Sequence, residues 1–216
     1  MTIGEVNLAL LVPLGKPETE EAIDAILGGM VIAAWTAFET MASDLWVAAL
    51  NAHPVKLAAL SGTWHKPEKF EADELTEDEE DQKQDKTVKL QDLQMNGYDL
   101  SKKMGSVHKY RFKWGVLEGI RRAYGAAFSN HYDEIKSAIE DHSIDALAAA
   151  RNVLVHKAGV VDGKFKKKHR NWPAFAGLEP ETVLQLDGVA VRDLLGASLG
   201  SAIKLMNAVD IWLVSY

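Results

Sequence analysis

Three polar side chains near the end of one predicted helix have the types and spacing that phosphate chemistry requires. Arg151, Asn152 and His156 lie within Ile144–Gly159, an alanine-rich stretch whose final glycine suits a left-handed helix terminus. An imidazole gains and loses protons near neutral pH, so His156 is a candidate general acid or base. Arg151 offers phosphate oxygens a permanently charged donor fork. Asn152 shares the helix face of His156 and is predicted to orient the imidazole or a substrate.

Arg151 stands where an apolar residue is expected. Five apolar residues fall within about 60° of it on an ideal helix: Ile144, Leu147, Leu154, Val155 and Ala158. A cation in such a stripe is costly unless it meets an anion, a carboxylate or a subunit boundary. Glu39, on a long N-terminal helix, is a candidate orienting acid that faces Arg151. Because Arg151 and His156 point about 140° apart, we expect one helix alone not to make a compact site and a two-fold dimer to complete it.

The composition is that of an ordinary globular protein. The chain has 216 residues, of which 47% are hydrophobic and 25% charged, with a net charge of −7 and no cysteine. These values predict a single domain over residues 1–216 and exclude disulfides and thiolate metal sites. The acidic balance argues against a surface that coats nucleic acid indiscriminately. The segments Lys102–Arg122 and Lys164–Arg170 are nevertheless locally basic, and such a surface can bind a polyanion at one place.

The N-terminus and the apolar runs predict a cytoplasmic location. The first residues lack the basic region of a secretory signal, and Glu5 interrupts them. The longest charge-free apolar run, Ala25–Phe38, is too short to cross a bilayer. We therefore expect no membrane partner.

Helical periodicity dominates the chain. It predicts long helices over Pro17–Asn51, which Gly28-Gly29 can bend or split, and over Trp114–Phe128, His131–His156 and Val189–Tyr216. Helical fragments are expected in Val88–Met104, with breaks near Asn96-Gly97 and at Gly105. The predicted core face of the first helix consists of Ile23, Leu27, Val31, Ala34, Phe38, Leu45 and Ala49, and that of the last of Val191, Leu195, Leu199, Ala202, Met206, Val209 and Leu213.

The connecting segments complete an all-α prediction. Residues 71–86 are almost entirely charged and polar and are expected to form an acidic, solvated insertion within the domain. Val160–Ala176 is expected to be a basic, turn-rich connection. Val183–Asp187 has two interpretations, a short strand of a minor β-hairpin or an extended lead-in to the final helix. Together the elements predict an all-α bundle of about five to seven helices.

The motif resembles that of the HEPN superfamily (higher eukaryotes and prokaryotes nucleotide-binding). The hallmark of that family is an arginine, four to six residues and a histidine near the end of a late helix. Here the motif is Arg151-Asn152-Val153-Leu154-Val155-His156, with a polar residue directly after the arginine. The continuation, Lys157-Ala-Gly-Val-Val-Asp162, is similar to the family's exit from that helix. The close resemblance covers roughly residues 124–162, whereas the first and last long helices agree only in general architecture.

The resemblance implies a metal-independent endoribonuclease without a cofactor, acting as a homodimer in a toxin, stress or antiviral defence role. Its catalytic residues would be Arg151, Asn152 and His156, and RNA would be cleaved by its own 2′-hydroxyl to a 2′,3′-cyclic phosphate. The alternative is a non-catalytic HEPN-like module that binds a nucleotide or a protein. Family members with a nucleotidyltransferase antitoxin commonly carry tyrosine two residues after the histidine, where this chain has Ala158. Regulation through that tyrosine is therefore excluded, and a neutralising partner protein stays unidentified.

A basic group follows the motif and is predicted to hold the RNA backbone. Its members are Lys157, Lys164, Lys166, Lys167, Lys168 and Arg170. As a charge run alone, it would be only a solvated turn. The seven histidines show no metal-ligand spacing, and His131, His142 and His156 are eleven or more residues apart, so no metal site is predicted.

The motif also has a purely structural interpretation. Arg151 would then pair with Glu39 inside the bundle, and His156 would cap the last turn of its own helix, where a cation suits the helix dipole. Exposure of His156 separates the interpretations. A buried, capping imidazole favours the structural role, whereas an exposed one favours the nuclease or the binding module.

Overall fold

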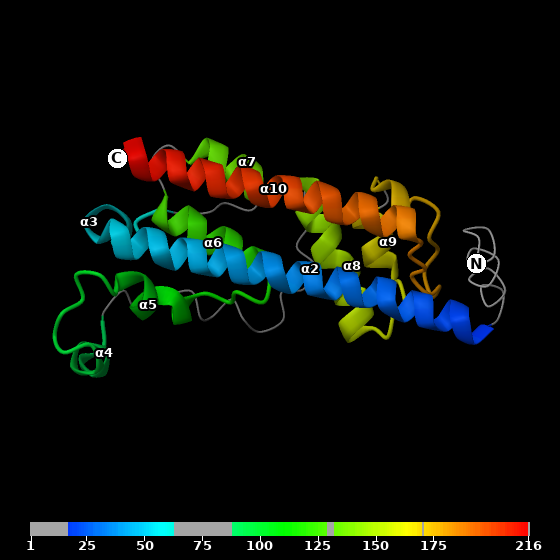
Figure 1. Ribbon diagram of the computed structural model, residues 1–216, viewed down its shortest axis with the longest axis horizontal. Helices are drawn as coiled ribbons and strands as arrows, with labels where there is room; N and C mark the ends of the chain where they lie inside the picture. Colours follow the sequence, from blue (N-terminus) through cyan, green and yellow to red (C-terminus); the bar gives the residue numbers. More distant parts are fainter. Residues whose placement is uncertain (1–16, 63–87, 129–131, 170, 216) are drawn as a thin grey trace, which may run out of the picture. The chain divides into compact units, whose positions relative to one another are not determined.

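The computed structural model describes residues 17–62, 88–128, 132–169 and 171–215, and these residues confirm the all-α prediction (Figure 1). The longest helices are α2 (Pro17–Ala52), α6 (Leu117–Ala127), α8 (His142–His156) and α10 (Gly188–Ser215). Shorter elements connect them: α3 (Pro54–Leu57), α4 (Leu90–Met95), α5 (Met104–His108), η2 (Lys109–Arg111), α7 (Asp133–Ile139), α9 (Gly163–His169) and η3 (Pro173–Phe175). The predicted acidic insertion at 71–86 lies outside the described residues.

The chain forms two compact units, and α2 and α10 each contribute to both. Unit 1 comprises the chain up to Ala37 together with His142–Gly200. Its core contains apolar side chains from α2, α8, α9, η3 and α10: Val31, Trp35, Ile144, Leu147, Phe165, Phe175, Val191 and Leu194. Helix α8 packs closely on α2, because a Cβ atom at Gly28 would lie 3.7 Å from Leu154 Cδ2. The hydroxyl of Ser198 on α10 donates to the carbonyl of Ser143 at 3.2 Å.

Unit 2 comprises Phe38–Asp141 and Ser201–Tyr216 and is built around Trp46 of α2. Its indole Nε1 donates to the Ala123 carbonyl of α6 at 2.9 Å. The ring meets Phe112 and Trp114 edge-on, with centroids 5.5 Å away in both cases. In the opposite direction, the hydroxyl of Tyr124 on α6 donates to the Ala42 carbonyl of α2 at 2.8 Å. These reciprocal bonds place α6 against α2 and satisfy polar atoms that burial would otherwise leave unpaired.

Several predicted helix boundaries are wrong. Gly105 lies inside α5 rather than ending a helix. By contrast, α2 matches the predicted Pro17–Asn51 to within one residue and runs through Gly28-Gly29 without a break. The predicted helix 131–156 is two helices, because Arg121 Nε donates to the Ile139 carbonyl, which a continuous helix would direct at residue 143. The expected basic connection 160–176 contains α9 and η3. The break near Asn96-Gly97 is confirmed, since α4 ends at Met95 and Gly97 has φ +64°.

The short-strand interpretation of Val183–Asp187 is wrong for the described residues. Val183 makes only an isolated antiparallel bridge with Val160, outside any strand. The lead-in interpretation of this segment agrees with that arrangement.

The predicted core faces of the long helices are only partly correct. Val31, Phe38 and Ala49 of α2 are buried, whereas Ile23 is exposed. In α10, Val191, Ala202 and Val209 are buried, but Leu199 and Met206 are exposed. The buried side of α10 instead includes Leu194, Ser198, Ser201, Leu205 and Trp212. The predicted core stripe of α10 therefore lies about one residue C-terminal to the buried one. Periodicity does not separate the two, because this helix has apolar residues on more than one side.

Helices α2 and α10 are long and apolar enough to cross a membrane, by length and composition alone. Mostly buried core helices of soluble proteins have the same composition. Both helices bury large side chains, Trp35 and Trp46 in α2 and Trp212 in α10, but only 22% of the apolar window in α2 and 39% of that in α10 are buried. The cytoplasmic location and the absence of a membrane partner stay predictions.

His108 is a buried ionisable group at the end of α5. Its side chain is 2% exposed, and no described residue gives its Nδ1 a hydrogen-bond partner. Burial, together with the Arg111 guanidinium, lowers the pKa of His108 to about 4, although the Asp92 carboxylate opposes this shift. The folded protein therefore holds this imidazole neutral at physiological pH.

We expect this histidine to make the protein less stable in mild acid. Between pH 6.5 and 4 the unfolded chain protonates His108 while the folded chain does not, so stability is full above pH 6.5 and falls as pH drops towards 4. At pH 5 the loss is about 2 kcal/mol. Urea unfolding at pH 7.5 and 5.0 should show this loss in the wild type and a smaller one in His108→Leu. His142→Ala, which removes an exposed histidine, is the control; an equal pH dependence in all three proteins would contradict the assignment.

Candidate active site at the end of helix α8

Helix α8 is buried through most of its length and emerges only in its last turns. Seven of the eight residues from Ser143 to Ala150 are buried, the exception being Asp145. After Ala150 only Val153 is buried within the helix, whereas Asn152, Val155 and His156 are exposed and Arg151 is half-buried. The residues of the predicted apolar stripe that precede Arg151 are therefore buried in the core, whereas those that follow it are not. Arg151 does not stand inside the core.

Arg151 contacts both of the other predicted catalytic side chains. Arg151 Nη1 lies 2.8 Å from His156 Nε2 and donates to Asn152 Oδ1 at 3.1 Å. A guanidinium can only donate, so His156 accepts through Nε2 in this arrangement and carries its proton on Nδ1. The expected angle of about 140° therefore does not keep Arg151 and His156 apart, and completion of the site by a two-fold dimer stays a prediction. The long arginine side chain spans the angle between the two positions.

Both contacts use the same terminal nitrogen of Arg151. Its two hydrogens serve Asn152 and His156, so neither residue engages the edge formed by Nε and Nη2. That edge binds a phosphate or carboxylate through two parallel hydrogen bonds. The arrangement can thus hold an anion and an imidazole beside the same guanidinium.

The backbone directly after the motif is fixed at several points. Gly159 has φ +82°, as predicted, and Ala158 also adopts a left-handed conformation at φ +48°. The Gly159 N–H donates to the Val153 carbonyl at 3.0 Å, which closes the last turn of α8. Gly159 and Val161 then bond to the segment 181–184, with Val161 N–H to Thr182 carbonyl at 2.8 Å and Leu184 N–H to Gly159 carbonyl at 2.7 Å.

Asp162 connects the exit of α8 to α9, a contribution that the sequence interpretation did not assign to it. Its Oδ1 accepts from the Phe165 N–H at 2.7 Å at the start of α9, and its Oδ2 pairs with Lys157. The hydrogen bond from Lys157, followed by that from the Phe165 N–H, lowers the pKa of Asp162. An aspartate just before a helix is the sequence signal that could have identified this cap.

The predicted RNA-binding lysines are only partly available. Lys157 pairs with Asp162, and Lys166 pairs with Glu179 at 2.5 Å. Lys164 and Lys167 are exposed on α9. The side chain of Lys168 and all of Arg170 lie outside the described residues. Helix α9 therefore presents cations next to α8, some of them already neutralised.

Glu39, the predicted orienting acid, belongs to unit 2, whereas Arg151 belongs to unit 1. Its Oε1 lies beside Gly115, 4.0 Å from the position of a Cβ atom there. Its role towards Arg151 stays a prediction. No group of three or more His, Cys, Asp or Glu side chains suited to a metal ion occurs within the described ranges.

Comparison with known proteins gives no match. No protein-family model, no curated protein and no solved structure matches this chain. The likeness to HEPN proteins thus rests on the motif and its surroundings in the sequence.

The left-handed conformation of Ala158 generates a stability prediction. A non-glycine residue in this region is strained, and glycine is not. We expect Ala158→Gly to stabilise the folded protein by up to about 1 kcal/mol, measured as a higher midpoint of urea unfolding. Ala150→Gly, at a buried position inside the same helix, is the opposite control and should be destabilising. A loss of stability in Ala158→Gly would show that the terminus of α8 has a different conformation.

Proposed function

We propose that the protein is a metal-independent endoribonuclease and that Arg151, Asn152 and His156 perform the reaction. The observation that carries this proposal is the 2.8 Å contact between Arg151 Nη1 and an exposed His156 Nε2. A histidine that capped its helix would bond to a backbone carbonyl, whereas His156 accepts from the guanidinium at the surface. The pair combines a proton acceptor and a cation, the base and the charge stabiliser that RNA self-cleavage needs besides an acid for the leaving oxygen.

In the proposed reaction a phosphodiester binds the Nε–Nη2 edge of Arg151. The 2′-hydroxyl of the adjacent ribose replaces the guanidinium as the partner of His156 Nε2 and gives up its proton there. The 2′-oxygen forms a bond to phosphorus and the bond to the 5′-oxygen breaks. The products are a 2′,3′-cyclic phosphate and a 5′-hydroxyl, whose proton comes from a second acid. Arg151 stabilises the charge that accumulates on the phosphorus oxygens.

A homodimer would provide this acid as the protonated His156 of the second copy, because a two-fold axis brings two copies of the motif into one cleft. Exposed apolar side chains on unit 1 support self-association: Ile26 is 63% exposed, Leu199 61% and Val155 44%. Val155 lies between the two motif residues on α8. Covering such side chains is a common reason for subunit contact. The toxin or defence role belongs to this same proposal, with a neutralising protein still to be identified.

The decisive test is cleavage of end-labelled RNA in EDTA by the wild type and by Arg151→Ala and His156→Ala. We expect 2′,3′-cyclic phosphate ends from the wild type and a loss of at least about 100-fold in rate in both variants. His142→Ala and Arg192→Ala are matched controls, since both side chains are exposed in unit 1. Circular dichroism checks that all four variants fold.

Two outcomes would contradict the nuclease. No cleavage of structured or unstructured RNA, with binding that still depends on Arg151, would favour the non-catalytic module. Equal cleavage by the wild type and by both folded motif variants would place the activity elsewhere or in a contaminant.

The dimer is tested by introducing a charge on unit 1. Ile26→Asp should shift the protein to the monomer in sedimentation velocity and reduce cleavage, because each site would then lack its second acid. Val214→Asp is the control, since Val214 is 83% exposed on α10 in unit 2. A wild type that sediments as a monomer and cleaves at full rate would rule out the dimeric mechanism.

A further inference from the structure

A second polycationic surface occurs in unit 2, on the segment Lys102–Lys113. The segment carries five cations, Lys102, Lys103, Lys109, Arg111 and Lys113, and the chain has no Asp or Glu between Asp99 and Glu118. In a protein with a net charge of −7, such a run is a local exception to the acidic balance. The electrostatic attraction of a polyanion by this basic run is therefore confined to one place on the molecule.

The segment is anchored to α2 at Gly105 and exposes three of its five cations. Gly105 packs so closely on α2 that a Cβ atom there would lie 2.3 Å from the Val47 carbonyl oxygen. The Gly105 N–H donates to Asn51 Oδ1 at 2.8 Å. The buried positions are Gly105, Val107, His108 and Arg111, whereas Lys102, Lys103, Tyr110 and Lys113 are exposed. The outward side chains are thus presented from a fixed backbone.

Tyr110 adds an aromatic ring to this cationic face. It is 55% exposed, and the ammonium of Lys89 lies 5.6 Å from the centre of its ring. Lys109, the residue before it, pairs with Asp44 at 3.3 Å, so part of its charge is already compensated. Exposed lysines together with an exposed ring are the residue types of single-strand binding surfaces, in which lysines follow the phosphates and aromatic rings stack on bases.

We propose that this surface, formed by Lys89, Lys102, Lys103, Tyr110 and Lys113, binds single-stranded RNA. The choice of RNA rests on the proposed function, while the exposed aromatic ring favours a nucleic acid over an acidic polypeptide. The surface gives the substrate a contact in unit 2 that is separate from the motif on α8.

The test measures binding of a fluorescent single-stranded 20-mer to the full chain carrying His156→Ala, which prevents cleavage. We expect Lys102→Ala/Lys103→Ala to weaken binding and to lower the slope of log affinity against log salt by about 1.4. Tyr110→Ala should weaken binding roughly tenfold without changing that slope, and Tyr110→Phe should bind like the parent. Inorganic polyphosphate, which has charges but no bases, should respond to the lysine changes and not to Tyr110→Ala.

Matched controls lie in the same unit. Lys136→Ala removes an exposed lysine of α7. Tyr98→Asn removes a tyrosine that is 67% exposed, and asparagine tolerates its φ of +62°. Both control variants should bind RNA like the parent.

The outcomes separate this inference from the proposed nuclease. RNA affinity that is equal in the parent, lysine and tyrosine variants would overturn the inference, whatever the cleavage assay shows. Displacement of RNA by polyglutamate, with no effect of Tyr110→Ala, would also overturn it and would indicate an acidic protein partner. Affinity that depends on Lys102, Lys103 and Tyr110 would support it even if the wild type cleaves no RNA.

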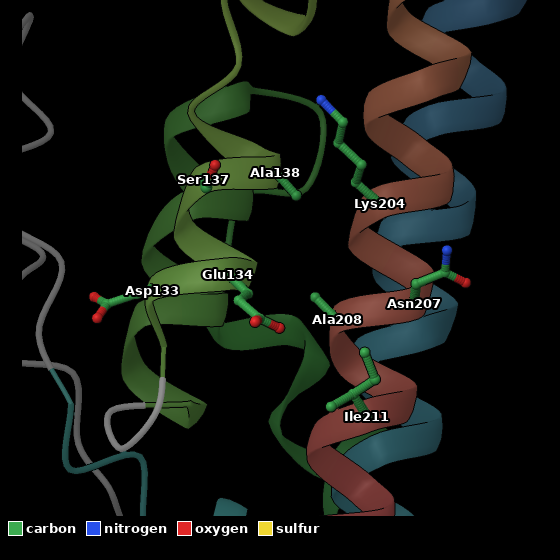
Figure 2. Close-up of a pocket in the computed structure, with 8 residues that line it drawn as sticks. All are labelled: Asp133, Glu134, Ser137, Ala138, Lys204, Asn207, Ala208 and Ile211. Carbon is green, nitrogen blue, oxygen red and sulfur yellow. The ribbon is translucent and has the colours of Figure 1, made fainter.

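The groove between α7 and α10 in unit 2 carries no comparable inference. It has a volume of about 430 Å³ and is lined by acidic, basic and apolar side chains (Figure 2). Glu134 and Lys204 bring opposite charges to it, so neither the sign of its charge nor its shape selects a class of ligand.

Discussion

The burial of α8 from Ser143 to Ala150 is the constraint on which the candidate site depends. Small residues on several sides of this part of the helix let it pack against its neighbours in unit 1, so its direction is fixed before the motif begins. The motif then occupies the turns that leave the core. The exit is fixed as well, by the bonds of Gly159 and Val161 to residues 181–184 and by the Asp162 cap. Arg151, Asn152 and His156 therefore project from a backbone that is anchored on both sides of the motif.

The end of this helix follows from the sequence, but helical angles alone understate the reach of its arginine. Angles on a helical wheel describe where Cβ atoms point, and by that measure Arg151 and His156 diverge. The guanidinium is several bonds away from its Cβ atom, so it can turn along the helix surface and reach Nε2 of His156. The same wheel placed Arg151 in a core stripe. A helical wheel does not show how far along α8 the neighbouring elements of unit 1 bury its side chains.

The errors in the fold have a similar origin. The pattern of residues 131–156 is helical throughout, and the break at Glu140 depends on Arg121 taking the Ile139 carbonyl from another helix. The stripe predicted for α10 missed Ser198, whose burial depends on hydrogen bonds to Leu194 and Ser143. Helix existence follows from local periodicity. Helix ends and buried polar positions depend on partners distant in sequence, which one sequence does not reveal.

The resting Arg151–His156 hydrogen bond places a requirement on any substrate. While His156 Nε2 accepts from the guanidinium, its lone pair is occupied and it cannot act as a base. A phosphate on the Nε–Nη2 edge leaves this bond intact, so binding of an anion alone does not activate the imidazole. A ribose hydroxyl that competes for Nε2 is needed as well. Under the proposed mechanism, proton transfer therefore requires a ligand that presents a phosphate and a neighbouring hydroxyl together, which would distinguish RNA from DNA and from simple phosphate esters.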